Sequence, residues 1–153
     1  PSPRTMPTED TIRQLEAQHW KQRALPGFMG VAGPLWTRHE ADGWAYGLLL
    51  APGHLNPAGV AHGGALLTLI DHVMSTVAWE ASGRTPCLTL QLDTQLLAPA
   101  RAGQFVEARA RVVRRTHSLL FMQGSVTLDD APILVAQAIL KASSTHPTHR
   151  PSA

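Results

Sequence analysis

The sequence predicts an α+β fold in which one long central helix is wrapped by a curved antiparallel β-sheet. Residues 64–82 carry apolar side chains at helical spacing and lie between glycines. Two segments before this stretch and four after it alternate apolar and polar residues, which is typical of antiparallel strands with one buried face. A helix this apolar must be buried. The remaining segments are predicted strands, so we expect them to form a curved sheet that packs around the helix.

Composition sets the broad class of the protein. A chain of 153 residues with 44% hydrophobic residues predicts one globular domain. The net charge of +2 gives no indication of nucleic-acid binding. Cys87 is the sole cysteine, which excludes an internal disulfide and a thiolate zinc site. No apolar run reaches the ~18 residues of a membrane span, and the N-terminus does not resemble a secretory leader. We therefore expect a cytoplasmic protein without a membrane partner.

The N-terminal elements are short. Residues 1–7 are expected to be disordered, and Thr8 can cap a helix that ends before Pro26. The Gly- and Pro-rich residues 26–34 predict a loop. Strands are expected at 35–40 and 44–50, with a turn at 41–43 between them. The predicted organisation is a tail and short helix at 1–27, the main domain at 28–143 and a disordered C-terminal tail at 144–153.

The long helix carries one carboxylate in an apolar setting. A helical wheel places an apolar stripe on one side, made of Leu66, Ile70, Val73 and Val77. A polar stripe lies on another side and contains Gly64, Thr68, Asp71, Ser75 and Ser82. No lysine, arginine or glutamine occurs between positions 63 and 79, so this is not an ordinary solvated face. Desolvation favours the protonated form of a carboxyl group, which makes Asp71 a candidate general base or nucleophile.

The helix entrance suits a polarised carbonyl group. Gly63 and Gly64 leave backbone N–H groups open to a ligand, although a glycine pair also permits close packing on a strand. Asn56 and His62, in the preceding loop, can orient a ligand or water. Asp71 lies ~10 Å along the axis from Gly64, too far for both to act on one carbonyl. A two-fold dimer with antiparallel helices would bring the two groups together.

Four strands are expected after the helix, at 88–96, 106–112, 119–128 and 133–142, with a turn at 129–132. In the first of them, strict alternation predicts one apolar face and one polar face. The apolar face would carry Leu88, Leu90, Leu92 and Leu96. The polar face would carry Thr89, Gln91, Asp93 and Gln95.

The stretch NPAGVAHGGALLTLID, residues 56–71, resembles a known pattern. The pattern is N-x-x-G-x-x-H-G-G followed by aspartate, which is found in hotdog-fold acyl-CoA thioesterases of the PaaI-like group and in 4-hydroxybenzoyl-CoA thioesterases. PCLTLQLDTQLLAPARAG and LVAQAILKAS resemble later strands of the same family, so the resemblance covers about 28–143. It implies a hotdog fold and hydrolysis of aromatic or short- to medium-chain acyl-CoA to a free acid and CoA. No metal or separate cofactor is implied, since coenzyme A is part of the substrate.

The resemblance also implies roles for individual residues. Asp71 would be the base or nucleophile, and the Gly64 amide would polarise the thioester carbonyl. Asn56 would place the water or the carbonyl, and His62 would shape the helix entrance. Two further hydroxyl groups match positions that contact the attacking water in relatives, and these belong to Ser75 and Thr89.

Substrate-binding residues follow from the same resemblance. Gly63 belongs to the helix entrance, and the segment RRTHSLLF matches a loop that contacts coenzyme A, which implicates Arg115, His117 and Ser118. Relatives usually have glycine where Thr116 stands, and a solvated hairpin is the alternative interpretation. The family forms homodimers or homotetramers with active sites at the dimer interface, and no nucleic-acid partner is implied.

Other functions fit the sequence less well. There is no G-x-S-x-G motif of a serine hydrolase. His54, His62, Asp71 and His72 have the spacing of no standard metal site. An acyl-thioester hydratase or dehydratase, or an acyl-CoA-binding domain without catalysis, remains as an alternative.

Overall fold

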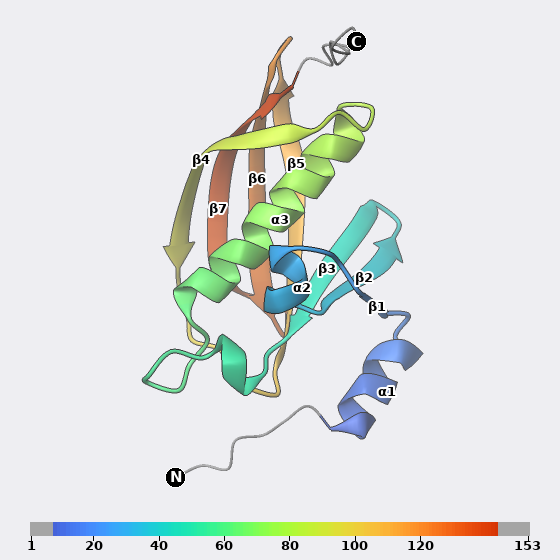
Figure 1. Ribbon diagram of the computed structural model, residues 1–153, viewed down its shortest axis with the longest axis vertical. Coiled ribbons are helices and arrows are strands. Elements are labelled where there is room, and N and C mark those ends of the chain that lie inside the picture. Colours follow the sequence, from blue (N-terminus) through green and yellow to red (C-terminus); the bar gives the residue numbers. More distant parts are fainter. Residues whose placement is uncertain (1–7, 144–153) are drawn as a thin grey trace, which may run out of the picture.

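The computed structural model describes residues 8–143, and its main feature is a long helix held by a curved sheet (Figure 1). The helices are α1 (Glu9–Ala17), α2 (Phe28–Ala32) and α3 (Gly63–Ala81), with a 3₁₀ turn η1 (Pro52–His54) before α3. The strands are β1 (Lys21–Arg23), β2 (Leu35–Glu40), β3 (Gly43–Leu49), β4 (Cys87–Leu96), β5 (Phe105–Arg115), β6 (Leu119–Leu128) and β7 (Ala131–Ala142).

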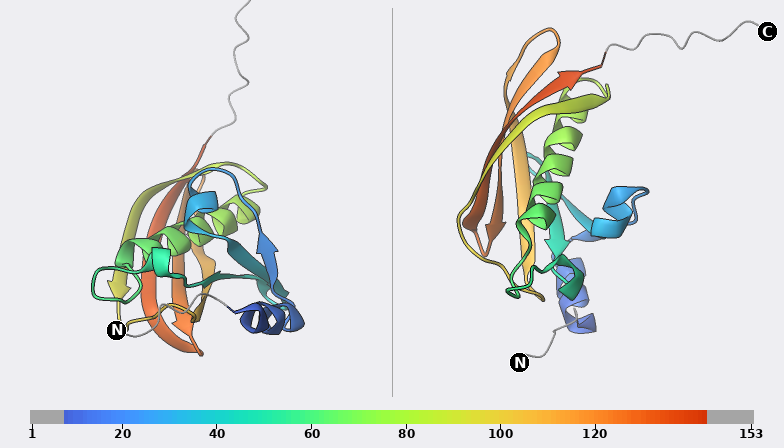
Figure 2. Two further views of the ribbon diagram at one scale, coloured as in Figure 1. Left: turned by 60° about the horizontal axis from the view of Figure 1, so that its bottom comes forward. Right: turned by 60° about the vertical axis from the view of Figure 1, so that its left-hand side comes forward.

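The seven strands form one antiparallel sheet in the order β1-β2-β3-β5-β6-β7-β4. The strand that follows α3 therefore lies at one edge, while β5, next in the chain, pairs with β3. Figure 2 shows how the sheet curves around α3. The predicted α+β hotdog architecture, a central helix wrapped by an antiparallel sheet, is confirmed.

The predicted apolar stripe of the long helix is buried. Leu66, Ile70 and Val73 are at most 3% exposed, and Val77 packs against the same core. Leu69, which lies outside the predicted stripe, is also buried, because the curved sheet covers a wider arc of the helix than the stripe alone. The helix spans 63–81 rather than 64–82, a difference of one residue at each end.

Two short elements of the N-terminal region were not predicted. The loop expected at 26–34 contains α2, whose Met29 packs against the core. Glycines at 27, 30 and 33 have low helix propensity, so no sequence pattern indicated this helix. It forms because it packs against the core. Strand β1 is three exposed residues without periodicity, and it exists because it pairs with β2. Thr8 caps α1 as predicted, accepting from the Thr11 N–H at 3.2 Å. The expected tails at 1–7 and 144–153 lie outside the described residues.

The segment before β2 also covers part of the outer sheet face, on the side away from α3. Leu15 of α1 and Trp20 are buried there with Trp36, and α1 lies beside the β2–β3 end of the sheet (Figure 2). The Phe105 ring packs against Trp20 at a centroid distance of 4.8 Å. It also lies over Gly47, where an added Cβ would be 2.0 Å from the ring. Only glycine leaves room for that ring.

An ion-pair cluster holds β2 and β5 together on the same outer face. Arg109 donates to both oxygens of Glu40, at 2.9 and 2.6 Å, and to Glu107 at 2.9 Å. Arg38 donates to Glu40 at 2.8 Å. The hydrogen bond from Arg109 is the largest cause that lowers the pKa of Glu40, from 4.5 to about 2.

The turn between β6 and β7 is tighter than predicted. Asp129 and Asp130 have φ values of 48° and 66°, so these two residues alone make the turn and β7 begins at Ala131. Paired positive φ values match the twist of two-residue hairpins. Strand β5 extends to Arg115, three residues beyond its expected end.

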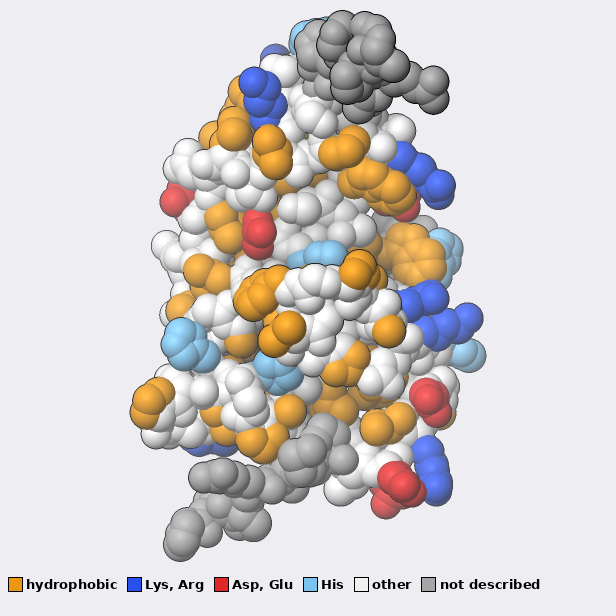
Figure 3. Space-filling view, viewed as in Figure 1, with side chains coloured by type: hydrophobic (Ala, Val, Ile, Leu, Met, Phe, Trp, Pro, Cys, Tyr) orange, Lys and Arg blue, Asp and Glu red, His pale blue; other side chains and the backbone are white. Residues whose placement is uncertain are grey.

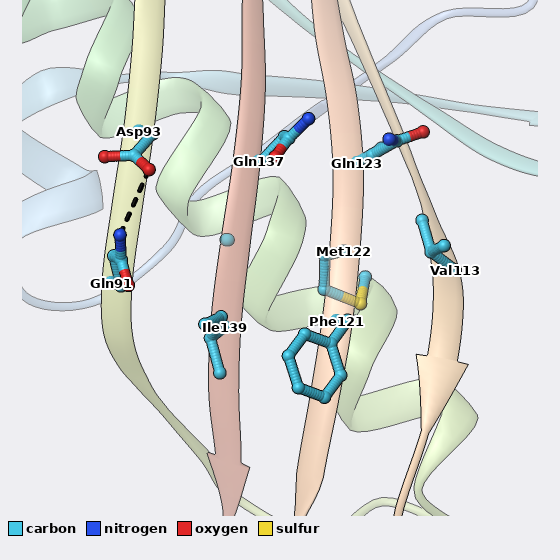
Figure 4. A pocket seen from close by; sticks show the side chains of 9 residues that line it. Gln91, Asp93, Val113, Phe121, Met122, Gln123, Gln137 and Ile139 are labelled. Atoms are coloured by element: carbon cyan, nitrogen blue, oxygen red, sulfur yellow. Dashed lines mark hydrogen bonds between the residues drawn. The ribbon is translucent and has the colours of Figure 1, made fainter.

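The predicted alternation of β4 is wrong because the strand contains a β-bulge. The register shifts between Thr89, which pairs with Leu140, and Gln91, which pairs with Ile139. Leu140 is buried, so Thr89 shares the helix-facing side of the sheet with it. Beyond the bulge, Gln91 and Asp93 lie on the outer face, which Figure 4 shows with α3 behind the sheet. The four leucines of the predicted buried face are divided: Leu92 packs on the core, whereas Leu88, Leu90 and Leu96 are exposed.

Candidate active site

The bulge in β4 completes the surroundings of Asp71. Thr89 Oγ1 donates to Asp71 Oδ1 at 2.7 Å, and Ser75 Oγ lies 3.5 Å from the same hydroxyl oxygen. Asp71 and Ser75 are one helical turn apart on α3, and both are half-buried. Without the extra residue in β4, Thr89 would point to the outer face. The carboxylate is therefore held in one orientation by a hydroxyl group that the bulge supplies.

His62 caps the entrance of α3. Its Nδ1 atom accepts a hydrogen bond from the Gly64 N–H at 2.9 Å. The Gly64 amide, which was expected to polarise a carbonyl group, is thus occupied within the chain. The Gly63 N–H donates to no acceptor among the described residues. It is the first amide of the helix, where the positive end of the helix dipole lies.

Both glycines also have a packing reason. A Cβ on Gly63 would lie 2.9 Å from Leu96 Cδ1, and a Cβ on Gly64 would lie 3.0 Å from His62 Nδ1. A side chain at either position would therefore displace a neighbour that shapes the entrance. The two interpretations of the glycine pair are therefore compatible: Gly63 leaves a backbone N–H free among the described residues, and both glycines permit tight packing.

Asn56 lies in the loop before the helix and closes it. Its Oδ1 atom accepts from the backbone N–H groups of Ala58, at 2.9 Å, and Val60, at 3.3 Å. The backbone adds a bond from the Gly59 N–H to the Asn56 carbonyl at 2.9 Å, and Gly59 has a φ of 82°. With its oxygen engaged, the Asn56 side chain offers only its NH₂ group to a ligand.

The predicted site residues form three groups along α3. Asn56, His62 and the glycines lie at its N-terminal end, while Asp71 with Ser75 and Thr89 lies near its middle. Eight residues separate Gly63 from Asp71, which is ~12 Å along the axis. The chain by itself does not bring the two groups onto one carbonyl atom.

The third group lies at the far end of α3, in the turn between β5 and β6. Arg115 Nη1 donates to the carbonyl of Ala81, the last residue of α3, at 2.7 Å. Thr116 Oγ1 accepts from the Leu119 N–H at 3.1 Å and closes the turn. His117 is exposed and Ser118 is half-buried. Arg115 therefore has a structural partner already, as a cation at a helix C-terminus.

Ser82, the last member of the predicted polar stripe, does not join the other polar side chains. It is the C-cap of α3, is 7% exposed, and its Oγ donates to the Trp79 carbonyl at 3.2 Å. Beside Asp71, the pKa of His72 is lowered by burial, and the negative charge of Asp71 partly opposes this. An imidazole in such a place favours its neutral form.

The described part of the chain offers neither a cluster of metal ligands nor a membrane-spanning helix. Residues 8–143 contain no group of three or more His, Cys, Asp or Glu side chains placed to hold a metal ion. In the same part of the chain, no helix combines the length and the apolar character that a membrane crossing requires.

Comparisons with known proteins point to one family. Residues 58–133 match the model of the thioesterase superfamily. Human acyl-coenzyme A thioesterase 13 is 29% identical over 85 residues, which are 55% of this chain and 60% of that protein. The match thus spans less than two thirds of the length of this curated relative.

Solved structures share the fold. A conserved protein of Pseudomonas aeruginosa has a TM-score of 0.72 at 24% identity, covering 78% of this chain and 96% of that one. A variant of the phenylacetic acid degradation protein PaaI of Thermus thermophilus has a TM-score of 0.65 at 25% identity, covering 76% and 98%. Residues 58–133 therefore match the thioesterase superfamily, and the chain has the hotdog fold that the PaaI variant shares.

Proposed function

We propose that the protein hydrolyses acyl-CoA thioesters, with aromatic or short- to medium-chain acyl groups, to a free acid and coenzyme A. The observation that carries this proposal is the carboxylate of Asp71, which Thr89 orients at 2.7 Å beside the exposed edge strand β4. The chemistry named for the human relative supports the substrate class. Neither a metal nor a separate cofactor takes part in the proposed reaction.

The proposed site forms between two subunits. Strand β4 is an edge strand with exposed leucines at positions 88, 90 and 96, which are costly to leave in water. Two copies that pair through this edge form a dimer, alone or within a tetramer. A two-fold axis there places Asp71 of the partner subunit opposite the Gly63 amide of the first. That arrangement overcomes the ~12 Å separation within one chain.

The reaction follows from these positions. The Gly63 amide, which is free of intrachain acceptors among the described residues, donates to the thioester carbonyl, while His62 holds Gly64 and the first turn in place. Asn56 donates its NH₂ group to the carbonyl or the water. Asp71 takes a proton from the water as it attacks, or attacks the carbonyl itself. In the first route the C–S bond then breaks and the CoA thiolate takes up that proton. In the second route CoA leaves as the thiolate, and water then hydrolyses the acyl–aspartate anhydride, which releases the acid, regenerates Asp71 and supplies the proton to the thiolate.

The first test is release of free CoA thiol from aromatic and aliphatic acyl-CoAs, with Asp71→Asn as the matched variant. We expect turnover to fall at least ~100-fold in the variant, the usual lower range for loss of a general base. The variant should remain folded and still bind acyl-CoA. Turnover close to that of the wild type would refute the role of Asp71. Binding without turnover in the wild type would indicate a binding domain instead.

Mixing two inactive variants tests the shared site. Asp71→Asn removes the carboxylate and Asn56→Ala alters the helix entrance. When the two proteins are mixed and allowed to exchange subunits, half of the dimers are mixed, and each mixed dimer has one intact site. Activity should recover to about a quarter of the wild-type value. No recovery, with exchange confirmed by mass spectrometry, would place all of these groups in one subunit.

A further inference from the structure

His54 connects three segments around the helix entrance. Its Nδ1 atom accepts from the Ala51 N–H at 3.0 Å, and its Nε2 atom lies 2.6 Å from the carbonyl oxygen of Ala32. Its own backbone carbonyl accepts from the His62 N–H at 2.8 Å. One residue thus contacts η1, the end of α2 and the residue that caps α3.

These contacts determine which nitrogen of the His54 ring donates and which accepts. A backbone N–H only donates, so Nδ1 carries no hydrogen atom. A backbone carbonyl only accepts, so Nε2 carries the hydrogen and donates it to Ala32. The bond reaches a carbonyl of the last turn of α2, which has no partner within that short helix. The ring therefore joins α2 to the loop of the candidate site.

Helix α2 has the surface of an element that meets an apolar ligand. Phe28 is 68% exposed and Val31 is 81% exposed, although Met29 between them packs on the core. In the space-filling view, hydrophobic side chains are exposed in the middle of the face that carries α2 (Figure 3). Near α2, a pocket of about 250 Å³ is lined by Leu25, which precedes α2 in the chain, and by His72 of α3.

We propose that His54 is a positioning residue, which fixes α2 beside the entrance of α3 so that α2 forms a wall of the acyl-binding site. This inference rests on the proposed function. His54 holds the Ala32 carbonyl with its ring and the His62 N–H with its backbone. His54 therefore links α2 to the thioester position at Gly63, in addition to the packing of Met29 on the core. Acyl groups long enough to reach α2 depend on the tether, and an acetyl group does not.

Two substitutions separate the two ring contacts. The side-chain oxygen of asparagine occupies the place of Nδ1, so His54→Asn keeps the bond to Ala51 and loses the tether to α2. The nitrogen of glutamine reaches as far as Nε2, so His54→Gln keeps the tether. Both variants retain the backbone bond to His62. The matched pair therefore differs in the tether to Ala32.

The experiment measures kcat and KM of the intact protein and both variants with acetyl-CoA and octanoyl-CoA. In His54→Asn we expect KM for octanoyl-CoA to rise about fivefold, the effect of one ordinary hydrogen bond. Its kcat and its KM for acetyl-CoA should stay within about twofold of the wild type. His54→Gln should keep the wild-type KM for both substrates. A wild-type KM for octanoyl-CoA in His54→Asn, or equal effects of both variants, would overturn the proposal.

Amide hydrogen exchange gives a readout that needs no activity. The Gly33 N–H donates to the Met29 carbonyl at 2.8 Å and closes the end of α2. It should exchange faster in His54→Asn than in the wild type or His54→Gln. Equal exchange rates in all three proteins would refute the tether itself. The wild-type protein could release no CoA while the Gly33 N–H still exchanges faster in His54→Asn than in the other two proteins. That result would refute the proposed function and the acyl wall, and it would confirm the tether.

Discussion

Replacing Thr89 with valine removes one hydroxyl group and keeps the shape of the side chain. The hydroxyl donates to Asp71 Oδ1 at 2.7 Å, and its nearest substitute, Ser75 Oγ, lies 3.5 Å from the Thr89 oxygen rather than on the carboxylate. Valine is also β-branched, so the strand propensity of β4 is kept. Thr89 is exposed in the chain, so the free energy of unfolding should change by no more than about 0.5 kcal/mol.

The expected kinetic effect is much larger than this effect on stability. A hydrogen bond to a charged group contributes about 1.5–3 kcal/mol, and about 1.4 kcal/mol corresponds to a tenfold change in rate. Thr89→Val should therefore lower kcat by about 10- to 150-fold. KM should change little, because Thr89 orients the carboxylate and does not hold the substrate.

The assay is steady-state CoA release, accompanied by urea unfolding of each variant. Thr89→Ser keeps the hydroxyl group and should retain most of the turnover. Thr94→Val is a matched control, since Thr94 pairs with Ala136 on the same face of β4 and, within residues 8–143, forms no hydrogen bond with Asp71. A wild-type kcat in Thr89→Val, or an equal loss in Thr89→Ser, would show that the bond between Thr89 and Asp71 has no catalytic role.

Three further changes test the fold and the turn between β5 and β6. Gly47→Ala places a Cβ 2.0 Å from the Phe105 ring and should lower the free energy of unfolding by about 1–3 kcal/mol. Adding Phe105→Leu to the same chain should recover much of this loss, as measured by urea unfolding. No recovery in the double variant would contradict the steric explanation. The pKa of Glu40 is lowered to about 2, mainly by the hydrogen bond from Arg109, so its contribution to stability is complete above pH 4.5 and is lost as the pH falls toward 2. The advantage of wild type over Glu40→Gln, about 2 kcal/mol at pH 7, should therefore vanish near pH 2, whereas a constant difference would exclude the ion pair as its cause. Arg115→Ala removes a cation that lies at the last turn of α3 and should lower the free energy of unfolding by about 0.5–1 kcal/mol. The ratio of the KM for acyl-CoA to the KM for acyl-pantetheine should stay unchanged. A rise in that ratio would show that Arg115 binds the CoA phosphates.

Elements with a strong period were predictable from the sequence. The apolar stripe of Leu66, Ile70 and Val73 gave α3 to within one residue at each end, because helical spacing persists over five turns. Strands β2 and β6 matched their predicted bounds. Elements without a period, such as β1 and α2, were not predictable, since packing and pairing with distant residues create them.

The site was predictable in its residue types and less so in its geometry. The spacing of the residues from Asn56 to Asp71 identified the candidate site residues. The distance along α3 between the glycines and Asp71 already implied a second subunit. The Gly64 amide, however, is bound by the His62 ring, a rotamer-dependent contact that spacing does not contain. The contact between His54 and Ala32 was also missed, because the two residues lie 22 positions apart in the chain.

By itself, the sequence determined the long buried helix, the antiparallel strands around it and the carboxylate on its polar stripe. These features depend on the period of side chains along one segment, which is local information. Only the tertiary structure decided that Thr89 faces Asp71, because a single extra residue in β4 puts Thr89 on the opposite face from Gln91 and Asp93, with which strict alternation had grouped it. A bulge is defined by the pairing of two strands, here β4 and β7, and strands β5 and β6 lie between these two in the chain. The direction of the decisive hydroxyl group is therefore a property of the sheet and not of the strand that carries it.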